Sequence, residues 1–329
     1  MTVINGIEID DINFKINELK LALNNNLPIE DKLNVIAVIS NPCLYAKRYQ
    51  LFNQFTNRIN ECENIRLYVV ELAYKNQKFF VTKSTNKNHL QIRTDTPLWH
   101  KENLINIAVD KLLPKNYKAF AWVDGDIDFE SNTWALDTLK ILNGYKDIVQ
   151  IFSHAVDMDK DETTLNIFSS FGYNFCKNKK FNNKKLFDFW HPGYAWAITR
   201  KAYEKIGGLY DKGILGSGDN IMAYSLINKC NYYTREKYSD DYNNSMLEFQ
   251  ENSKHLRLGY VPGVIRHYYH GKKKNRYYHE RTEILVNHQY SPNEDITYDA
   301  QGIIIPTNNF SEDFKNDILN YFLERKEDE

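Results

Sequence analysis

The feature that most constrains the fold is an alternation of strand-length apolar runs with helical patterns over the first 152 residues. The run "NVIAVI" is continuous and β-branched, which is typical of a strand buried on both faces of a sheet. Strands are expected at 34–39, 65–72, 119–123 and 147–152, and helices at 46–60 and 99–113. This order predicts an α/β fold with a mostly parallel central sheet and flanking helices.

Polar residues follow two of these expected strands directly. Ser40-Asn41-Pro42 ends the first, and Asp124-Gly125-Asp126 ends "AFAWV". Ligands of parallel α/β sheets bind beyond the carboxyl ends of the strands. Carboxylates this close raise one another's pKa unless a cation neutralises them, and their oxygens suit Mg²⁺ or Mn²⁺. We therefore expect Asp124 and Asp126 to bind a divalent metal. The alternative interpretation of the same residues is a solvated turn that happens to be acidic.

A second candidate for the metal site lies late in the chain, where His267 and His270 precede Gly271 and a basic run. Residues three apart on an extended strand face opposite sides, so we expect only one histidine to reach the metal. Imidazole together with carboxylate favours Mn²⁺ over Mg²⁺. The basic residues Lys272, Lys273, Lys274 and Arg276 could form a solvated loop, a nucleic-acid patch or a site for a pyrophosphate leaving group.

Two further motifs stand between these regions. Gly216-Ser217-Gly218-Asp219-Asn220 precedes an expected helix, so Asp219 is a helix cap, a general base or an anchor for a sugar hydroxyl. The stretch "WHPGYAW" (190–196) carries Trp190, His191 and Trp196, whose flat rings either pack in the core or stack on a sugar. Its Gly193 permits a close backbone approach.

Composition limits the classes of partner. The 329 residues are 42% hydrophobic and 26% charged, with a net charge of −1 and a pI near 6.8, which argues against a general nucleic-acid binder. No stretch approaches about 18 consecutive apolar residues, and the N-terminus lacks the pattern of a signal peptide. We expect a cytoplasmic protein with no transmembrane segment and with four free cysteines.

In this order, the D-G-D turn, "HPGYAW", "GGLYD…GSGDN" and the late histidines resemble a metal-dependent glycosyltransferase of the nucleotide-sugar (GT-A) fold. The middle region is most similar to the superfamily of β-1,4-galactosyltransferases and polypeptide N-acetylgalactosaminyltransferases. "LWHKENLINIAV" resembles the galactosyltransferase helix that contacts the nucleotide. The resemblance implies a UDP-sugar donor, Mn²⁺ or Mg²⁺, and a carbohydrate or glycoprotein acceptor.

The resemblance also assigns residues. It implies that Asp219 is catalytic, that Asp124, Asp126 and one of His267 and His270 bind the metal, and that Trp190, His191, Trp196 and Asn220 lie near the donor sugar or acceptor. The expected donor-nucleotide contacts are Ser40, Asn41, Pro42, Arg93, Trp99, Lys101, Asp124, Gly125, Gly193, Gly218, Lys272, Lys274 and Arg276. Inversion is favoured over retention, although Asn220 resembles the retaining enzymes.

We expect one domain over residues 1–329, with a nucleotide-binding half (33–155), an irregular donor-sugar and acceptor half (156–285) and a C-terminal extension (286–329). The extension is expected to end in a solvated amphipathic helix at 311–327. Two other functions fit the same motifs: a sugar- or nucleotide-binding module without turnover, and a metal-dependent phosphohydrolase with a strand-end D-x-D.

Overall fold

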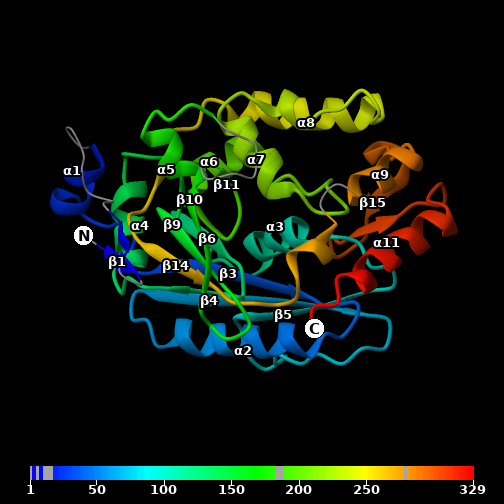
Figure 1. Cartoon of the computed structure of the whole chain (residues 1–329), viewed down its shortest axis with the longest axis horizontal. Helices are drawn as coiled ribbons and strands as arrows, with labels where there is room; N and C mark the ends of the chain where they lie inside the picture. Colours follow the sequence, from blue (N-terminus) through cyan, green and yellow to red (C-terminus); the bar gives the residue numbers. More distant parts are fainter. Residues whose placement is uncertain (1, 5–6, 10–17, 182–188, 278–279) are drawn as a thin grey trace.

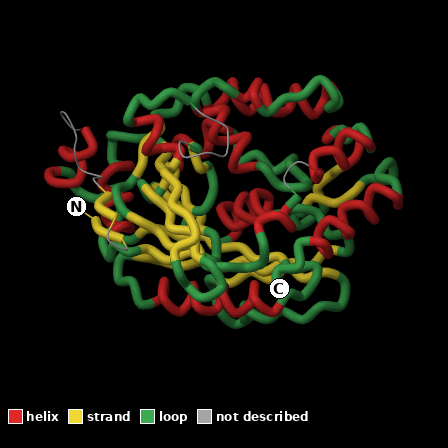
Figure 2. Tube along the Cα trace, in the orientation of Figure 1, coloured by secondary structure: helices red, strands yellow, loops and turns green. Residues whose placement is uncertain are grey.

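The computed structural model describes residues 2–4, 7–9, 18–181, 189–277 and 280–329. Its centre is a seven-stranded sheet, which crosses the middle of the molecule (Figures 1 and 2). From edge to edge the strands are β13 (Leu258–Tyr260), β8 (Ile148–Gln150), β12 (Ala195–Thr199), β6 (Ala119–Val123), β3 (Leu33–Ser40), β4 (Ile65–Tyr74) and β5 (His89–Thr94). Every neighbouring pair is parallel except the two made by β12, so the expected mostly parallel sheet is confirmed.

Helices cover both faces of this sheet because its strands bury side chains on both. In β3, Val35 and Ala37 pack on the side of α2 (Ala46–Asn60) and α4 (Trp134–Leu142), whereas Ile36 packs on the side of α3 (Lys101–Lys111). The helices are α1 (Glu18–Asn25), α2 (Ala46–Asn60), α3 (Lys101–Lys111), α4 (Trp134–Leu142), α5 (Phe171–Cys176), α6 (Arg200–Ile206), α7 (Gly218–Leu226), α8 (Asp240–Ser253), α9 (Glu280–Asn287), α10 (Pro292–Asp295) and α11 (Glu312–Glu324). Figure 1 shows α2 on one side of the sheet and α3 and α8 on the other.

A second, five-stranded sheet lies in the half that the sequence predicts to be irregular. Its order is β11 (Trp190–His191), β10 (Thr164–Ser170), β9 (His154–Met158), β14 (Val264–His267) and β7 (Ile127–Phe129). The strand β7 begins just after the D-G-D turn, so this sheet joins the turn to the late histidines. Two short sheets, β1 (Thr2–Ile4) with β2 (Ile7–Ile9) and β15 (Ile296–Tyr298) with β16 (Ile304–Pro306), and two 3₁₀ turns, η1 (Cys230–Tyr232) and η2 (Lys273–Arg276), complete the elements.

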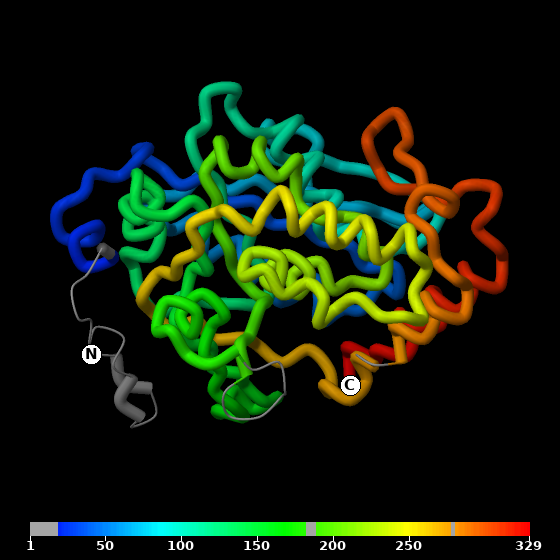
Figure 3. The backbone as a smooth tube through the Cα atoms, turned by 90° about the horizontal axis from the view of Figure 1, so that it is seen from above, coloured from blue at the N-terminus to red at the C-terminus, as the bar shows by residue number. Residues whose placement is uncertain are grey.

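The C-terminal extension packs on the same core as the central sheet. Phe314, Ile318, Tyr321 and Phe322 of α11 are buried in the cluster that contains Ile36. Seen from above, the red helix α11 runs beside the orange segment that contains α9 (Figure 3). The expected helix at 311–327 is therefore present but half-buried, because its apolar stripe has a partner.

The four cysteines are free thiols, as expected. Within the described part of the chain, no helix combines the length and the apolar character needed to cross a membrane.

Candidate functional site

The D-G-D turn lies at the carboxyl end of β6, where the chain passes from the central sheet to the second sheet. All five residues of β6 are buried, and the Asp124 N–H donates to the carbonyl of Tyr194 over 2.9 Å. A Cβ on Gly125 would lie 2.3 Å from Cδ2 of Phe52, which is closer than any real contact. Glycine is therefore required for the turn to pack against α2, and the turn aims both carboxylates at one cavity.

The two carboxylates of the turn have different partners. Asp124 forms an ion pair with Lys101, the first residue of α3. Burial raises the pKa of Asp124 although Lys101 opposes the shift. Burial lowers the pKa of Lys101, but the carboxylates of Asp124, Glu102 and Asp219 together outweigh it, so that pKa is raised. Asp126 instead faces the two late histidines. The sequence predicts that both carboxylates bind one metal, whereas here Asp126 lies with the histidines and Asp124 pairs with Lys101.

Both late histidines reach Asp126. The Nε2 atom of His270 lies 3.0 Å from Oδ2 of Asp126, and the Nε2 atom of His267 lies 3.9 Å from the same oxygen. The sequence predicts that only one of them reaches the metal. Both imidazoles lie near Asp126 because β14 ends at His267, so the alternation of an extended strand no longer applies at His270.

These three side chains fit a divalent metal. One ligand atom from each of Asp126, His267 and His270 lies within 4.8 Å of the others, and Oδ1 of Asp126 is buried without a hydrogen-bond partner among the described residues. Burial lowers the pKa of His267 to about 4, so its imidazole is neutral at pH 7, as a metal ligand must be. A carboxylate with two imidazoles suits a transition-metal ion such as Mn²⁺ better than Mg²⁺.

A second carboxylate orients His267. The Nδ1 atom of His267 lies 2.6 Å from Oδ1 of Asp157, which stands opposite it on the parallel neighbour β9. Asp157 is buried and also pairs with Lys273. Such a contact fixes the tautomer that leaves Nε2 free for a metal. The sequence reasoning missed Asp157 because no motif marks the strand that carries it.

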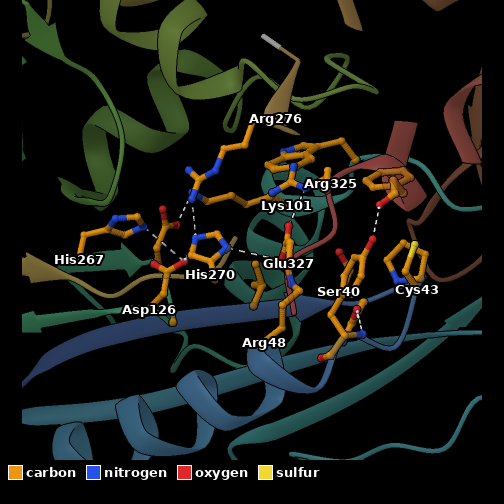
Figure 4. A pocket seen from close by; sticks show the side chains of 18 of the residues that line it. Ser40, Cys43, Arg48, Lys101, Asp126, His267, His270, Arg276, Arg325 and Glu327 are labelled. Carbon is orange, nitrogen blue, oxygen red and sulfur yellow. Dashed lines mark hydrogen bonds and ion pairs between the residues drawn. The ribbon is translucent and has the colours of Figure 1, made fainter. Parts of the chain in front are cut away.

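A cavity of about 150 Å³ lies beside the cluster (Figure 4). Eight of the expected nucleotide contacts line it: Ser40, Asn41, Pro42, Trp99, Lys101, Asp124, Gly125 and Arg276. Eight further lining residues were missed: Val38 of β3, Cys43, Tyr45 and Arg48 near the start of α2, Tyr194, and Phe322, Arg325 and Glu327 from the C-terminal extension. In the sequence, "YFLERKEDE" shows only that it is short and highly charged. Both features predict a solvent-exposed segment and give no sign of a cavity.

Asp219 lies in a small hollow that adjoins the cavity and shares Lys101 and Tyr194 with it. It is the second residue of α7, whose capping position is Ser217, so Asp219 does not cap the helix. A Cβ on Gly193 would lie 3.1 Å from Oδ2 of Asp219. Gly193 and Gly218 both line this hollow. Because glycine has no side chain, the backbone of the hollow can lie close to the carboxylate of Asp219.

Glu102 is a second carboxylate in this hollow, and the sequence reasoning did not single it out. It is buried in the first turn of α3, and burial raises its pKa to about 7. Its carboxyl group packs against the backbone of Gly218, where a Cβ would lie 2.5 Å from Cδ of Glu102. Three carboxylates, Asp124, Asp219 and Glu102, therefore surround Lys101.

Several expected contacts lie elsewhere. Arg93 donates to the carbonyl of Gln77 over 2.9 Å and is exposed. Trp190 is buried against the rings of Phe171 and Phe181, so it is a core residue. Lys272 and Lys274 are exposed and do not line the cavity of about 150 Å³, although Lys272 lines a second cavity that His267 and His270 also border.

The remaining three candidates surround Gly193 and Asp219. His191 stacks on Tyr194 at 4.2 Å. Trp196 is buried, donates from Nε1 to the carbonyl of Pro192 over 2.8 Å and lines the hollow of Asp219. Asn220 donates to its neighbour Asp219.

Fold and site together define an α/β protein with a candidate metal centre at the edge of a cationic cavity. No protein-family model matches the chain, and no curated protein matches it by sequence.

Solved structures with a similar chain trace include three transferases. One is described as a nucleotide-diphospho-sugar transferase from Desulfovibrio desulfuricans (8% identity, 79% of this chain and 99% of that chain, TM-score 0.33). Another is a mannosyltransferase from Pyrobaculum calidifontis in complex with GDP-Man and Mn²⁺ (12%, 82% and 67%, 0.39). A third is a Drosophila β-1,4-galactosyltransferase 7 with manganese, UDP-Gal and xylobiose (10%, 84% and 94%, 0.38). At this level of similarity a shared trace assigns no activity to the chain.

Proposed function

We propose that the chain is a metal-dependent glycosyltransferase of the nucleotide-sugar (GT-A) fold, with a UDP-sugar as donor. The observation that supports it best is the cluster of Asp126, His267 and His270 at the carboxyl end of β6, beside a cavity lined by cationic side chains. A divalent cation, Mn²⁺ in preference to Mg²⁺, would supply charge that stabilises the nucleoside diphosphate leaving group.

The side chains around the cavity then have separate tasks. Lys101 lies between Asp124 and the cavity, where its ammonium group can also pair with a phosphate. Trp99 and the loop Ser40–Pro42 line the part of the cavity proposed for the nucleoside. Gly193, which lacks a side chain, lets the backbone lie close to the carboxylate of Asp219, where the donor sugar is proposed to bind.

Asp219 is the proposed catalytic residue. In an inverting reaction, which we favour, its carboxylate takes the proton of the acceptor hydroxyl, and the acceptor oxygen then bonds to the sugar carbon as the bond to the diphosphate breaks. In a retaining reaction the same carboxylate would orient the donor sugar. The acceptor is proposed to be a carbohydrate or a glycoprotein, as the resemblance to galactosyl- and N-acetylgalactosaminyltransferases suggests.

The test is a screen of UDP- and GDP-sugars with and without Mn²⁺, with thermal shift and release of nucleoside diphosphate as readouts. We expect a UDP-sugar to raise the melting temperature only with Mn²⁺ and to be slowly hydrolysed. Stabilisation without any release would indicate a binding module instead, and release of inorganic phosphate alone would indicate a phosphohydrolase. Either result would overturn the proposal.

A further inference from the structure

The end of the chain enters the cavity of the candidate site. After α11, Arg325 and Glu327 turn inward and are 6% and 2% exposed, whereas their neighbours Lys326 and Asp328 are exposed. Figure 4 shows Glu327 between Arg48 and His270, on the same cavity as Asp126. A charged tail that buries two of its charges has to find partners for them.

Glu327 has such partners on three sides. Nη1 of Arg48 donates to both of its carboxylate oxygens, at 3.1 and 2.9 Å, and Nε of Arg325 donates to Oε1 over 2.6 Å. Nδ1 of His270 lies 3.5 Å from Oε2. Burial alone would raise the pKa of Glu327, but the charges of Arg48 and Arg325 hold it well below its usual range. Two guanidinium groups converging on one anion form the arrangement that also binds phosphate.

The tail also covers the ring that the sequence assigns to the nucleotide. The guanidinium of Arg325 lies 5.4 Å from the ring centroid of Trp99, within cation–π distance. The Nε1 atom of Trp99 is buried and has no hydrogen-bond partner within the described residues. The space left open is about 150 Å³, whereas pockets for small ligands usually have roughly 300–1,000 Å³. The tail therefore fills part of the space that a nucleotide would need.

The tail is held in place by contacts at the surface. The carboxylate of Asp328 accepts the backbone N–H groups of Ala46 and Lys47, at 3.0 and 2.8 Å, in the first turn of α2. The hydroxyl of Tyr45 donates to the carbonyl of Leu323 over 2.7 Å. Exposed contacts of this kind contribute little individually, so this part of the chain can open without unfolding the core.

We propose that Arg48 and Arg325 form an anion-binding subsite, separate from the Asp126 cluster, that Glu327 occupies in the unliganded chain and that the diphosphate of a nucleotide takes over when it binds. This inference rests on the proposed function for the identity of the ligand. Glu327 then acts as an internal competitor, which lowers the apparent affinity for diphosphates in proportion to its occupancy.

The test compares Glu327→Gln with the wild-type chain and with Glu324→Gln, an exposed carboxylate of α11, as the matched control. Calorimetry with Mn²⁺ present measures binding of UDP, inorganic pyrophosphate and uridine. We expect Glu327→Gln to bind UDP and pyrophosphate about tenfold more tightly, which corresponds to an occupancy of about 90% by Glu327. The affinity of Glu327→Gln for uridine should not change. The control variant Glu324→Gln should bind all three ligands as the wild-type chain does.

A second variant guards against a folding defect in the first. Asp328→Asn leaves Glu327, Arg48 and Arg325 intact and weakens only the contact between the tail and α2. It should therefore raise the affinity for pyrophosphate about two- to fivefold. In the wild-type chain, hydrogen exchange at residues 327–329, beyond Arg325 of the subsite, should become faster when pyrophosphate binds. Equal or weaker diphosphate binding by both variants would overturn the inference, as would slower exchange of the tail.

The outcomes separate this inference from the proposed function. Tighter pyrophosphate binding without turnover of any nucleotide sugar would support the subsite and count against the glycosyltransferase. Turnover of a UDP-sugar without tighter pyrophosphate binding in either variant would support the glycosyltransferase and count against the subsite. If Glu327→Gln instead weakens binding of Mn²⁺ itself, then Glu327 only orients His270 and the subsite is refuted.

Discussion

Two walls of the same cavity are built in different ways. On one wall, Asp126 and His267 stand at the ends of paired strands, and Asp157 lies opposite His267 in the ladder between β9 and β14. On the other wall, Arg325 and Glu327 follow the last helix and are held by side-chain contacts. Backbone ladders open only with the core, whereas a segment held by side-chain contacts opens locally. The difference teaches that the wall with the candidate metal ligands is the fixed wall and that the tail wall is the one that opens locally.

The largest expected effect comes from breaking the fixed wall at its carboxylate. Asp126→Ala should abolish the Mn²⁺-dependent stabilisation by UDP and lower turnover by at least about 10³, because the remaining imidazoles hold the metal poorly. The melting temperature of the metal-free chain should stay nearly unchanged. Thermal shift with and without Mn²⁺ measures both effects, and a collapse of the metal-free chain would show that Asp126 is structural.

The next effect concerns the hollow between the walls. Asp219→Asn keeps the shape of the side chain and removes its charge, so sugar transfer should fall by at least about 10² while donor affinity stays within a few-fold. Steady-state kinetics and donor titration check this expectation. A variant that transfers sugar at the wild-type rate would exclude Asp219 from catalysis, and the anomeric configuration of the wild-type product, read by NMR, would separate the base from the orienting role.

Asp157→Asn compares the two walls directly, because it changes the carboxylate that pairs with His267 on the fixed wall. Loss of the charge on the partner of His267 should weaken Mn²⁺ binding about 10- to 100-fold. The equivalent change on the tail, Glu327→Gln, should leave Mn²⁺ binding alone and affect diphosphates. Titration of Mn²⁺ by electron paramagnetic resonance distinguishes the two walls. Asp161→Asn, at an exposed position of the β9–β10 hairpin, is the matched control.

The smallest expected effect is a pH dependence of stability. Burial raises the pKa of Glu102 from 4.5 to about 7, so between these values the folded chain holds a proton that the unfolded chain releases. The free energy of unfolding should therefore fall by about 1–3 kcal/mol as the pH rises through this window. Urea unfolding at pH 5, 6, 7 and 8 should show that Glu102→Gln flattens this slope, and an unchanged slope would mean that other groups cause it.

Much of the nucleotide half could be predicted because its signals are local. The expected helix at 46–60 and the expected strand at 119–123 coincide with α2 and β6. A buried strand is a continuous apolar run and a covered helix repeats its apolar residues every three to four positions, so both patterns can be read without the fold. Position also identified the D-G-D turn, since carboxylates that follow a buried run must lie at a sheet edge.

The sequence by itself determined the alternation of strands and helices, the edge where Asp124 and Asp126 emerge, and the late pair of histidines. Only the tertiary structure decided that Asp124 pairs with Lys101, that Asp126 faces both histidines and that Trp190 belongs to the core. It also brought Glu327 onto Arg48, 279 residues away in the chain. Periodicity reports the solvent exposure of neighbouring residues, whereas an ion pair between distant segments leaves no repeat in the sequence. The contacts that complete this site therefore exist only once the two sheets and the last helix have packed.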